Sequence, residues 1–303
     1  MTASIAVQEM TAVEAQPGKN GFSLISSGKL IALYAAMVKC RMIGERAALL
    51  MRQGKLARHF HDAVGQEATI AGVAVDLLPE DTLSLSHGSF LAGFLAGQPL
   101  ERMFSSLEAA PWNVTAPAAT PADPLQTACD AALGLKTSRS GNVAVAFCGD
   151  GAARLECWRE TLALAGHHEL PIVLVCHNDA RDEREDLTAA TRFEEMADGA
   201  LACGVPFITV DGNDVVAVYR VASESVARAR LGRGPTLIEC RAHRFHGGAG
   251  TGPESAAPLE AHDPIRNMET YLLGKGLFHA ELKSGIATEF GRELDAATRS
   301  FND

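Results

Sequence analysis

The sequence has little positive charge and no pattern of closely paired cysteines. Its 303 residues contain 27 Lys and Arg against 37 Asp and Glu, a formal net charge of −10. Non-specific binding to nucleic acid depends on clustered Lys and Arg, so no nucleic acid partner is expected. The seven cysteines are odd in number, and no two of them have CxxC spacing. We therefore expect reduced cysteines in the core of a cytoplasmic protein.

The sequence also lacks internal repeats and long apolar runs. The first twenty residues have neither a basic start nor a continuous apolar core, so we expect no signal peptide and no membrane span there. Residues 1–24 are predicted to form a flexible arm, and residues 116–124, rich in proline and alanine, a surface loop. With 47% hydrophobic residues, the chain can bury a large core. We predict a single α/β domain from residue 25 to residue 303.

The first third of the chain is predicted to be helical. Apolar residues at helical spacing predict a long amphipathic helix from Lys29 to about Gln53, with Gly54 near its end. A second helix is predicted to begin near Gln66. Short helices are expected between Gly88 and Leu107.

After the proline-rich loop, apolar strands alternate with helices. The strands are predicted at residues 143–147, 172–176, 207–210 and 236–240, and the helices at residues 125–135, 153–165, 191–203 and 215–230. Strands rich in Val, Ile, Leu and Cys that alternate with helices are typical of a parallel sheet covered by helices on both faces. Two more helices, at residues 265–273 and 280–297, follow. The predicted fold class is therefore α/β, with helical N- and C-terminal additions.

Acidic residues follow two successive strands. Asp150 lies in a Gly149-Asp150-Gly151 turn, and Asp179 ends the next predicted strand segment, Cys176-His177-Asn178-Asp179. In open parallel sheets, ligands bind at the carboxyl ends of the strands. Glycines let the backbone approach an anion, and a carboxylate beside a phosphate requires a divalent cation such as Mg²⁺ between them. From the residues alone, two simpler interpretations stay open. The Gly-Asp-Gly segment could be a plain strand-to-helix turn, and Asp150 and Asp179 could belong to two unrelated loops.

Seven segments together carry a resemblance to a known family. They are LYAAMVKCRMIGERAALLMRQGKL (33–56), GQEA (65–68), GDGAA (149–153), LPIVLVCHND (170–179), VDGNDVVAVY (210–219), GPTLIECRAHRFHG (234–247) and DPI (263–265). In this order and spacing, the chain resembles the α subunit of the thiamine diphosphate-dependent decarboxylase components of 2-oxo acid dehydrogenase complexes. The pyruvate, branched-chain and acetoin types belong to this family, and the resemblance covers roughly residues 29–273.

The resemblance implies a thiamine diphosphate-binding type of α/β fold and an α2β2 assembly. It implies that the cofactor lies between an α and a β chain, with the diphosphate and Mg²⁺ held by the α chain. The glutamate that activates the aminopyrimidine belongs to the β chain in this family, so the isolated chain is not expected to turn over. The implied reaction is decarboxylation of a small-molecule 2-oxo acid, with acyl or aldehyde transfer.

The resemblance also assigns cofactor and metal roles to individual residues. Asp150 matches the metal-binding aspartate, and Gly151 and Ala152 match the backbone donors to the diphosphate. Asp179 stands at the place of a metal-binding asparagine. Arg181 stands where the family offers a main-chain carbonyl to the metal.

The resemblance places three candidate catalytic histidines around the cofactor. His61 matches a substrate-side histidine upstream of GQEA, and His87 matches the first residue of a His/Tyr-Arg-x-His element. The rest of that element differs, because Gly88 replaces the arginine that pairs with phosphate and Phe90 replaces the second histidine. A glycine supplies none of the charge-assisted hydrogen bonds of a guanidinium. His246 is the third candidate.

The loop around His246 departs from the family as well. Where the family has Arg-x-x-Gly-His-Ser, Gly248 stands at the histidine position and Ala249 at the serine position. These departures keep one alternative open beside the enzyme subunit, a non-catalytic assembly or regulatory partner of the same fold. A subunit of a two-chain, transketolase-like enzyme is a further alternative, because it shares the Gly-Asp-Gly metal motif, but it explains GQEA and HRFHG poorly.

Overall fold

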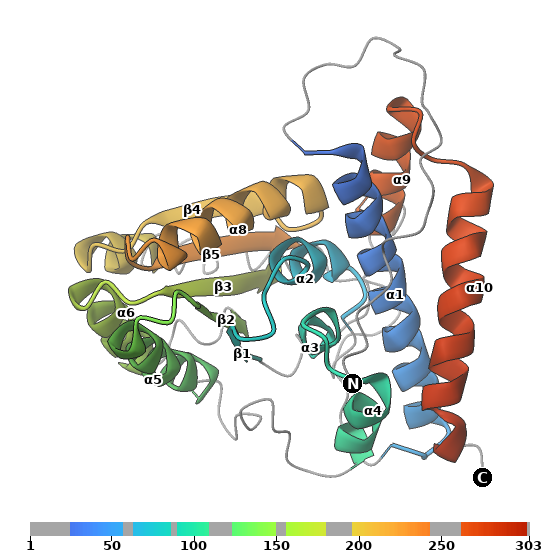
Figure 1. Ribbon diagram of the computed structural model, residues 1–303, viewed down its shortest axis with the longest axis horizontal. Helices are drawn as coiled ribbons and strands as arrows, with labels where there is room; N and C mark the ends of the chain where they lie inside the picture. The colour runs from blue at the N-terminus through green and yellow to red at the C-terminus, as the bar shows by residue number, and fades with distance from the viewer. Residues whose placement is uncertain are drawn as a thin grey trace, which may run out of the picture.

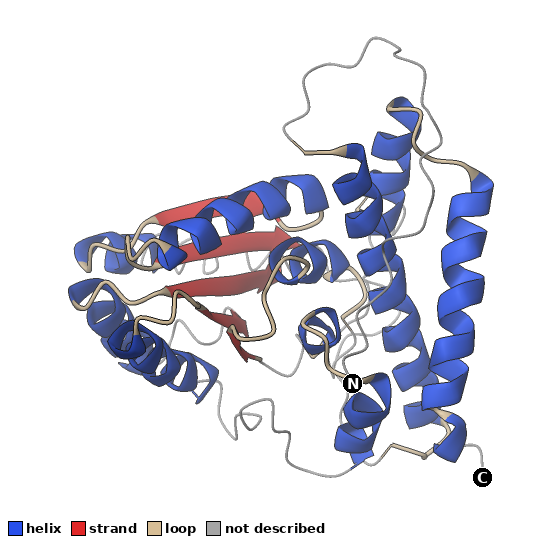
Figure 2. Cartoon of the chain, viewed as in Figure 1, coloured by secondary structure: helices blue, strands red, loops and turns tan. Residues whose placement is uncertain are grey.

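The centre of the fold is a five-stranded sheet in which every pair of neighbouring strands is parallel. The computed structural model describes residues 25–56, 63–85, 90–108, 123–149, 156–179, 196–242 and 262–301 (Figures 1 and 2). The strands are β1 (Thr82–Ser84), β2 (Ala144–Gly149), β3 (Ile172–Asp179), β4 (Phe207–Asp211) and β5 (Thr236–Ala242). Their order in the sheet is β1-β2-β3-β5-β4.

Helices precede, connect and follow these strands. They are α1 (Ser27–Arg52), α2 (Glu67–Ala74), α3 (Leu91–Leu95), α4 (Leu100–Glu108), α5 (Asp123–Ser138), α6 (Glu156–His167), α8 (Val215–Arg230), α9 (Pro264–Gly274) and α10 (Ala280–Ala297). Residues 196–202 form a further helical segment, and Arg299–Phe301 form a short 3-10 turn.

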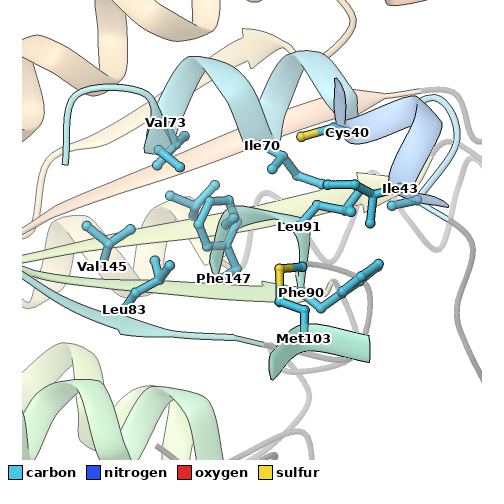
Figure 3. Packing of buried hydrophobic residues seen from close by; sticks show 14 of the residues in the cluster. Cys40, Ile43, Ile70, Val73, Leu83, Phe90, Leu91, Met103, Val145 and Phe147 are labelled. Atoms are coloured by element: carbon cyan, nitrogen blue, oxygen red, sulfur yellow. The ribbon is translucent and has the colours of Figure 1, made fainter. Parts of the chain in front are cut away.

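Side chains that alternate along the strands divide the core between the two faces of the sheet. On one face, Val145 and Phe147 of β2 pack with residues of α2, α3 and α4 in a single buried cluster (Figure 3). Helix α8 covers the same face. Gly72 allows α2 and α8 to pack closely, because a Cβ there would approach Cγ1 of Val218 to 2.7 Å.

The opposite face is covered by α5, α6 and the helical segment 196–202. Ala144 and Ala146, which alternate with Val145 and Phe147 along β2, pack there with Trp158 and Leu162 of α6. The buried thiols of this cluster are those of Cys129, Cys148 and Cys176. The prediction of a parallel sheet with helices on both faces is therefore confirmed.

A third cluster joins the N- and C-terminal helices beside the sheet. Leu33 and Met37 of α1 pack with Met268 and Leu272 of α9. Figure 1 shows α1, α9 and α10 side by side next to the sheet, and α1 contacts both other helices. Among the described helices, none combines the length and the apolar character that crossing a membrane requires.

Most elements lie where the sequence predicts them, but one strand was missed. Helices α8 and α10 have the predicted bounds, whereas β3 and β5 extend to Asp179 and Ala242, beyond the predicted ends. The first third of the chain is not entirely helical, because β1 pairs in it with β2 through Thr82↔Ala144. Three residues are too few to show an alternating pattern. The predicted arm at 1–24 and residues 116–122 of the predicted loop lie outside the described residues. The last two residues of that loop, Asp123 and Pro124, belong instead to α5, which begins earlier than predicted.

A buried carboxylate joins the amino-terminal ends of β1 and β2. Asp81 Oδ1 accepts hydrogen bonds from the Val143 backbone N–H (3.0 Å) and from Arg230 Nη1 (2.9 Å), and Asp81 Oδ2 accepts from Arg230 Nη2 (2.5 Å). The Asp81 side chain is 1% exposed. This two-point contact with the last residue of α8 fixes the helix over the sheet.

Gly166 of α6 lies where no larger residue fits. A Cβ at this position would overlap the carbonyl oxygen of Cys203 and come within 3.3 Å of Cγ2 of Val205. The backbone at 203–205 is held by its own hydrogen bonds to residues 199–201, so it cannot move aside freely. Close approach of α6 to this turn therefore requires glycine.

We predict that Gly166→Ala lowers the free energy of unfolding by about 2 kcal/mol or more, because the added methyl group must displace backbone. The matched control is Gly134→Ala in α5, where a Cβ meets nothing within 4 Å. Helix propensity makes that change neutral or stabilising by up to about 1 kcal/mol. Denaturant unfolding followed by circular dichroism measures both values. Equal stability of the two variants would contradict the close contact at Gly166.

Candidate functional site

The candidate site is the carboxyl-terminal edge of the sheet, where β2 and β3 end side by side. Gly149 is the last residue of β2 and pairs with His177, and Asp179 is the last residue of β3 and pairs with Ala242 of β5. Gly149 is exposed, and a Cβ built on it would meet no atom of the described residues within 4 Å. The described part of the chain therefore leaves space beside Gly149.

Of the residues predicted for cofactor and metal binding, Gly149 and Asp179 lie in the described part of the chain. Their backbones occupy the ends of neighbouring strands, as the sequence predicts, while their roles stay predictions. The other predicted residues fall outside the described ranges: His61, His87, Asp150, Gly151, Ala152, Arg181 and His246. Within the described ranges, no group of three or more His, Cys, Asp or Glu side chains gathers in a way that could hold a metal ion.

Just below this edge, the carboxylate of Glu239 connects three strands. Its Oε1 accepts a hydrogen bond from Asn178 Nδ2 of β3 (2.8 Å), and its Oε2 accepts one from Thr209 Oγ1 of β4 (2.7 Å). Arg241 donates to both oxygens, from Nε at 3.0 Å and Nη2 at 3.3 Å. Glu239 is 0% exposed and Asn178 is 7% exposed. Asn178, the member of this cluster on β3, immediately precedes Asp179, the last residue of that strand.

A second buried carboxylate, Glu67, organises the region beside the strand ends. It belongs to the GQEA segment and is 1% exposed. Its Oε1 accepts from Arg41 Nε of α1, and its Oε2 accepts from the backbone N–H of Gly65 (2.9 Å). Arg41 Nη2 also donates to Asp263 Oδ1 (3.0 Å), the residue that caps α9. One guanidinium thus joins α1, α2 and the start of α9.

The electrostatics of Glu67 are dominated by its burial. Removal from water raises the pKa of this carboxyl group, and the hydrogen bond and positive charge of Arg41 oppose that rise. Arg41 stays protonated, with its pKa raised by Glu67 and Asp263 despite burial. Arg41 therefore limits the rise in the pKa of Glu67 that burial alone would produce.

A chain of hydrogen bonds continues from Gly65 to the end of β5. Asn213 Nδ2 donates to the Gly65 carbonyl (2.9 Å), and Thr69 Oγ1 donates to the Gly212 carbonyl (3.1 Å). The Gly212 N–H in turn donates to the Arg241 carbonyl (2.6 Å). Gly65 has φ +97°, a conformation that favours glycine. The GQEA and VDGND segments, far apart in sequence, therefore meet at the sheet edge.

The cysteines near the edge have the character of core residues, as predicted. Cys148 and Cys176 are buried and lie opposite each other in neighbouring strands. Burial raises the pKa of the Cys240 thiol to about 12, and Glu239 and Cys148 add to the rise while a hydrogen bond with Thr69 opposes it. Thiols with so high a pKa are poor nucleophiles. All seven cysteines are free.

Sequence reasoning overlooked Glu239, Asn178 and the partners of Glu67. A glutamate in the otherwise apolar segment TLIEC was the available signal, because a charged residue inside a central strand requires buried partners. The partners themselves carry no local signal, since Asn178 lies 61 positions away and Thr209 lies 30 positions away. Phe90, at the place of a family histidine, is 3% exposed and packs in the core (Figure 3).

Comparison with known proteins gives consistent results. The family model described as "Dehydrogenase E1 component" matches residues 34–303. The α subunit of acetoin:2,6-dichlorophenolindophenol oxidoreductase from Bacillus subtilis is 32% identical over 279 residues, which are 84% of this chain and 84% of the relative. The pyruvate dehydrogenase E1 α subunit from Staphylococcus epidermidis is 28% identical over 292 residues, 91% of this chain and 78% of the relative.

We predict that Arg41→Met destabilises the protein in a pH-dependent manner. Loss of one partner from a buried ion pair costs about 3–5 kcal/mol near neutral pH. Without Arg41, the pKa of Glu67 rises further above its unfolded value. Unfolded chains then release this proton at lower pH than folded chains, so stability is lost as the pH rises from the unfolded pKa, about 4.3, through the folded pKa.

Denaturant unfolding at pH 5, 6, 7 and 8 measures this effect. Burial raises the pKa of Glu67 in the wild type as well, but less than in the variant. The deficit of Arg41→Met is therefore expected to grow with pH, as the wild-type carboxyl group ionises beside Arg41 while that of the variant stays protonated. The control is Lys29→Met, which removes the partly exposed ion pair with Asp76 and costs at most about 1 kcal/mol. A deficit of the same size at all four pH values would refute the role assigned to Glu67.

Proposed function

The chain belongs to the dehydrogenase E1 component family, and from this we propose that it is the α-type subunit of an enzyme that uses thiamine diphosphate and Mg²⁺. It acts on a 2-oxo acid by decarboxylation with acyl or aldehyde transfer. It works with a β subunit, in an α2β2 assembly. The match to the E1 model favours this function over the transketolase-like alternative.

One observation carries the proposal: the ends of β2 and β3 are neighbours in the sheet, paired at Gly149↔His177. Asp150 follows Gly149 in the chain, and Asp179 is the last residue of β3. Two carboxylates and a main-chain carbonyl form an all-oxygen donor set, which suits Mg²⁺. The described residues leave space beside Gly149, which suits a bulky anion at the same edge. The donor chemistry of this edge therefore fits a metal-bound diphosphate.

In the proposed mechanism, this chain holds the cofactor and aligns the substrate. Asp150, Asp179 and the main-chain carbonyl of Arg181 hold Mg²⁺, while the backbone N–H groups of Gly151 and Ala152 donate to the diphosphate. Thiamine diphosphate, when bound, supplies the carbanion chemistry.

The three histidines act on the substrate side in this proposal. His61, His87 and His246 polarise the substrate carbonyl or transfer protons, roles that suit an imidazole near neutral pH. The buried clusters of Glu67 and Glu239 keep the surrounding backbone in place. The seven free cysteines support the cytoplasmic location that we propose for this enzyme.

A second candidate function rests on Phe90. Its side chain is buried in the core, so this position supplies no imidazole to the site where the family has a histidine. Gly88, Gly248 and Ala249 likewise lack the functional groups of their family counterparts. These substitutions favour a subunit that keeps the fold and the β-chain interface for assembly or regulation without catalysis.

We predict that the chain, co-purified with a β-type subunit, binds thiamine diphosphate with saturable heat when titrated in the presence of Mg²⁺. Asp150→Ala is expected to weaken this binding by about 100-fold or more, because loss of a direct metal ligand exceeds the tenfold to 100-fold cost of losing an outer partner. The matched control is Asp130→Ala on the exposed surface of α5, which removes the same charge. Absence of saturable heat, unaltered by Asp150→Ala, refutes cofactor binding.

Turnover by the same complex separates the two candidates. Because one relative is named for acetoin and 2,6-dichlorophenolindophenol and another for pyruvate, reduction of the dye is assayed with acetoin, pyruvate and branched-chain 2-oxo acids. Dye reduction that is lost with Asp150→Ala supports the enzyme. Cofactor binding without turnover of any of these substrates supports the non-catalytic partner.

A further inference from the structure

Glu239 is an unusual residue for a central strand of a parallel sheet. Its strand β5 lies between β3 and β4, and the preceding residues of β5 on the two faces, Leu237 and Ile238, are apolar and 0% exposed. Transfer of a carboxylate from water to such a place is costly unless hydrogen bonds and an opposite charge compensate. An apolar residue would fill the space at lower cost. Stability alone therefore does not explain a glutamate here.

The contacts of Glu239 are arranged to fix the ends of three strands relative to one another. Oε1 binds Asn178 on β3, Oε2 binds Thr209 on β4, and Arg241 closes the cluster from two residues further along β5. Thr209 pairs directly with Glu239 in the sheet, whereas Asn178 pairs with Arg241, so the contact between Asn178 and Glu239 runs diagonally to a residue two positions earlier in β5. Both contacts form only when β3, β4 and β5 are correctly aligned at their carboxyl ends.

The contact with Asn178 is the one that reaches the candidate metal site. Asn178 is buried, and the next residue in the chain is Asp179, the last residue of β3. Consecutive Cα atoms are about 3.8 Å apart, so a displacement of Asn178 is passed directly to the backbone of Asp179. Thr209 lies on β4, which is separated from β3 by β5. Its contact with Glu239 has no such link to Asp179.

We propose that Glu239 is a positioning residue for Mg²⁺-dependent cofactor binding: through Asn178 it fixes the end of β3 on which Asp179 stands. This inference rests on the proposed function, in which Asp179 is a metal ligand. Arg241, whose side chain is 59% exposed, donates to both oxygens of the carboxylate and places a positive charge beside it. Partners that orient a metal ligand typically contribute a factor of 10–100 to metal affinity.

The test uses three single variants of the complex with the β-type subunit. Glu239→Gln keeps the shape but removes the charge and places an amide nitrogen against hydrogen-bond donors. Asn178→Ala removes the link to β3, and Thr209→Val, the matched control, removes only the link to β4. For each complex, the dissociation constants of Mg²⁺ and thiamine diphosphate are measured by calorimetry, and the melting temperature is measured without cofactor.

Glu239→Gln and Asn178→Ala are each expected to raise the dissociation constant of Mg²⁺ by about tenfold or more. Thr209→Val is expected to change it by less than about twofold, although its melting temperature falls. The double variant Glu239→Gln/Asn178→Ala is expected to lose no more affinity than the weaker-binding single variant, since both act through one contact. If Glu239→Gln does not fold, the comparison of Asn178→Ala with Thr209→Val decides the question.

Three results would overturn the proposal. Wild-type affinity in both Glu239→Gln and Asn178→Ala shows that the cluster does not position the ligand. Losses of affinity that follow melting temperature in all three variants, Thr209→Val included, show a merely structural role. A wild-type complex that binds no cofactor overturns the proposed function, and the role of Glu239 with it. In the first two cases, the wild-type complex binds and the proposed function stands.

Discussion

Burial of the Glu67 carboxylate is the constraint on which the arrangement around the sheet edge depends. A carboxyl group that is 1% exposed needs hydrogen-bond partners, and here they are Arg41 on α1 and the backbone of Gly65 just before α2. Arg41 supplies the charge and also holds the residue that caps α9, while Gly65 supplies a backbone N–H. Any shift of α1, α2 or α9 would leave one of these groups without its partner. The carboxylate therefore enforces one packing of the helices beside the strand ends.

The main elements could be predicted because local signals and tertiary packing agree. Helix α8 begins at the predicted residue, since Asp214 caps it through the N–H groups of Val216 and Ala217. The lengths of β3 and β5 were underestimated because local signals and tertiary packing disagree at their ends. His177, Asn178 and Arg241 are polar and are typical of loops, yet their backbones pair in the sheet. The side chains of Asn178 and Arg241 contact Glu239 there. Strand β1 owes its existence to a partner 62 positions later, which no local pattern reveals.

The site could be predicted in its position but not in its supporting structure. Gly149 and Asp179 lie at neighbouring strand ends because parallel strands joined by a helix place those ends together. The pairing of Arg41 with Asp263 spans 222 positions, and that of Asn178 with Glu239 spans 61. Such partners are determined by the three-dimensional arrangement alone. The residues beside a site are accordingly harder to infer than the site itself.

The strand order β1-β2-β3-β5-β4 has a consequence for how the chain acquires its structure during synthesis. Among the described strands, β4 pairs only with β5, although it precedes β5 in the chain and helix α8 lies between them. A growing polypeptide therefore exposes β4 without a neighbour until α8 and β5 have left the ribosome. Until then its unpaired backbone groups are open to other strands. The sheet is therefore completed late in synthesis. The backbone of β4 is protected from pairing with other strands only after β5 has been made.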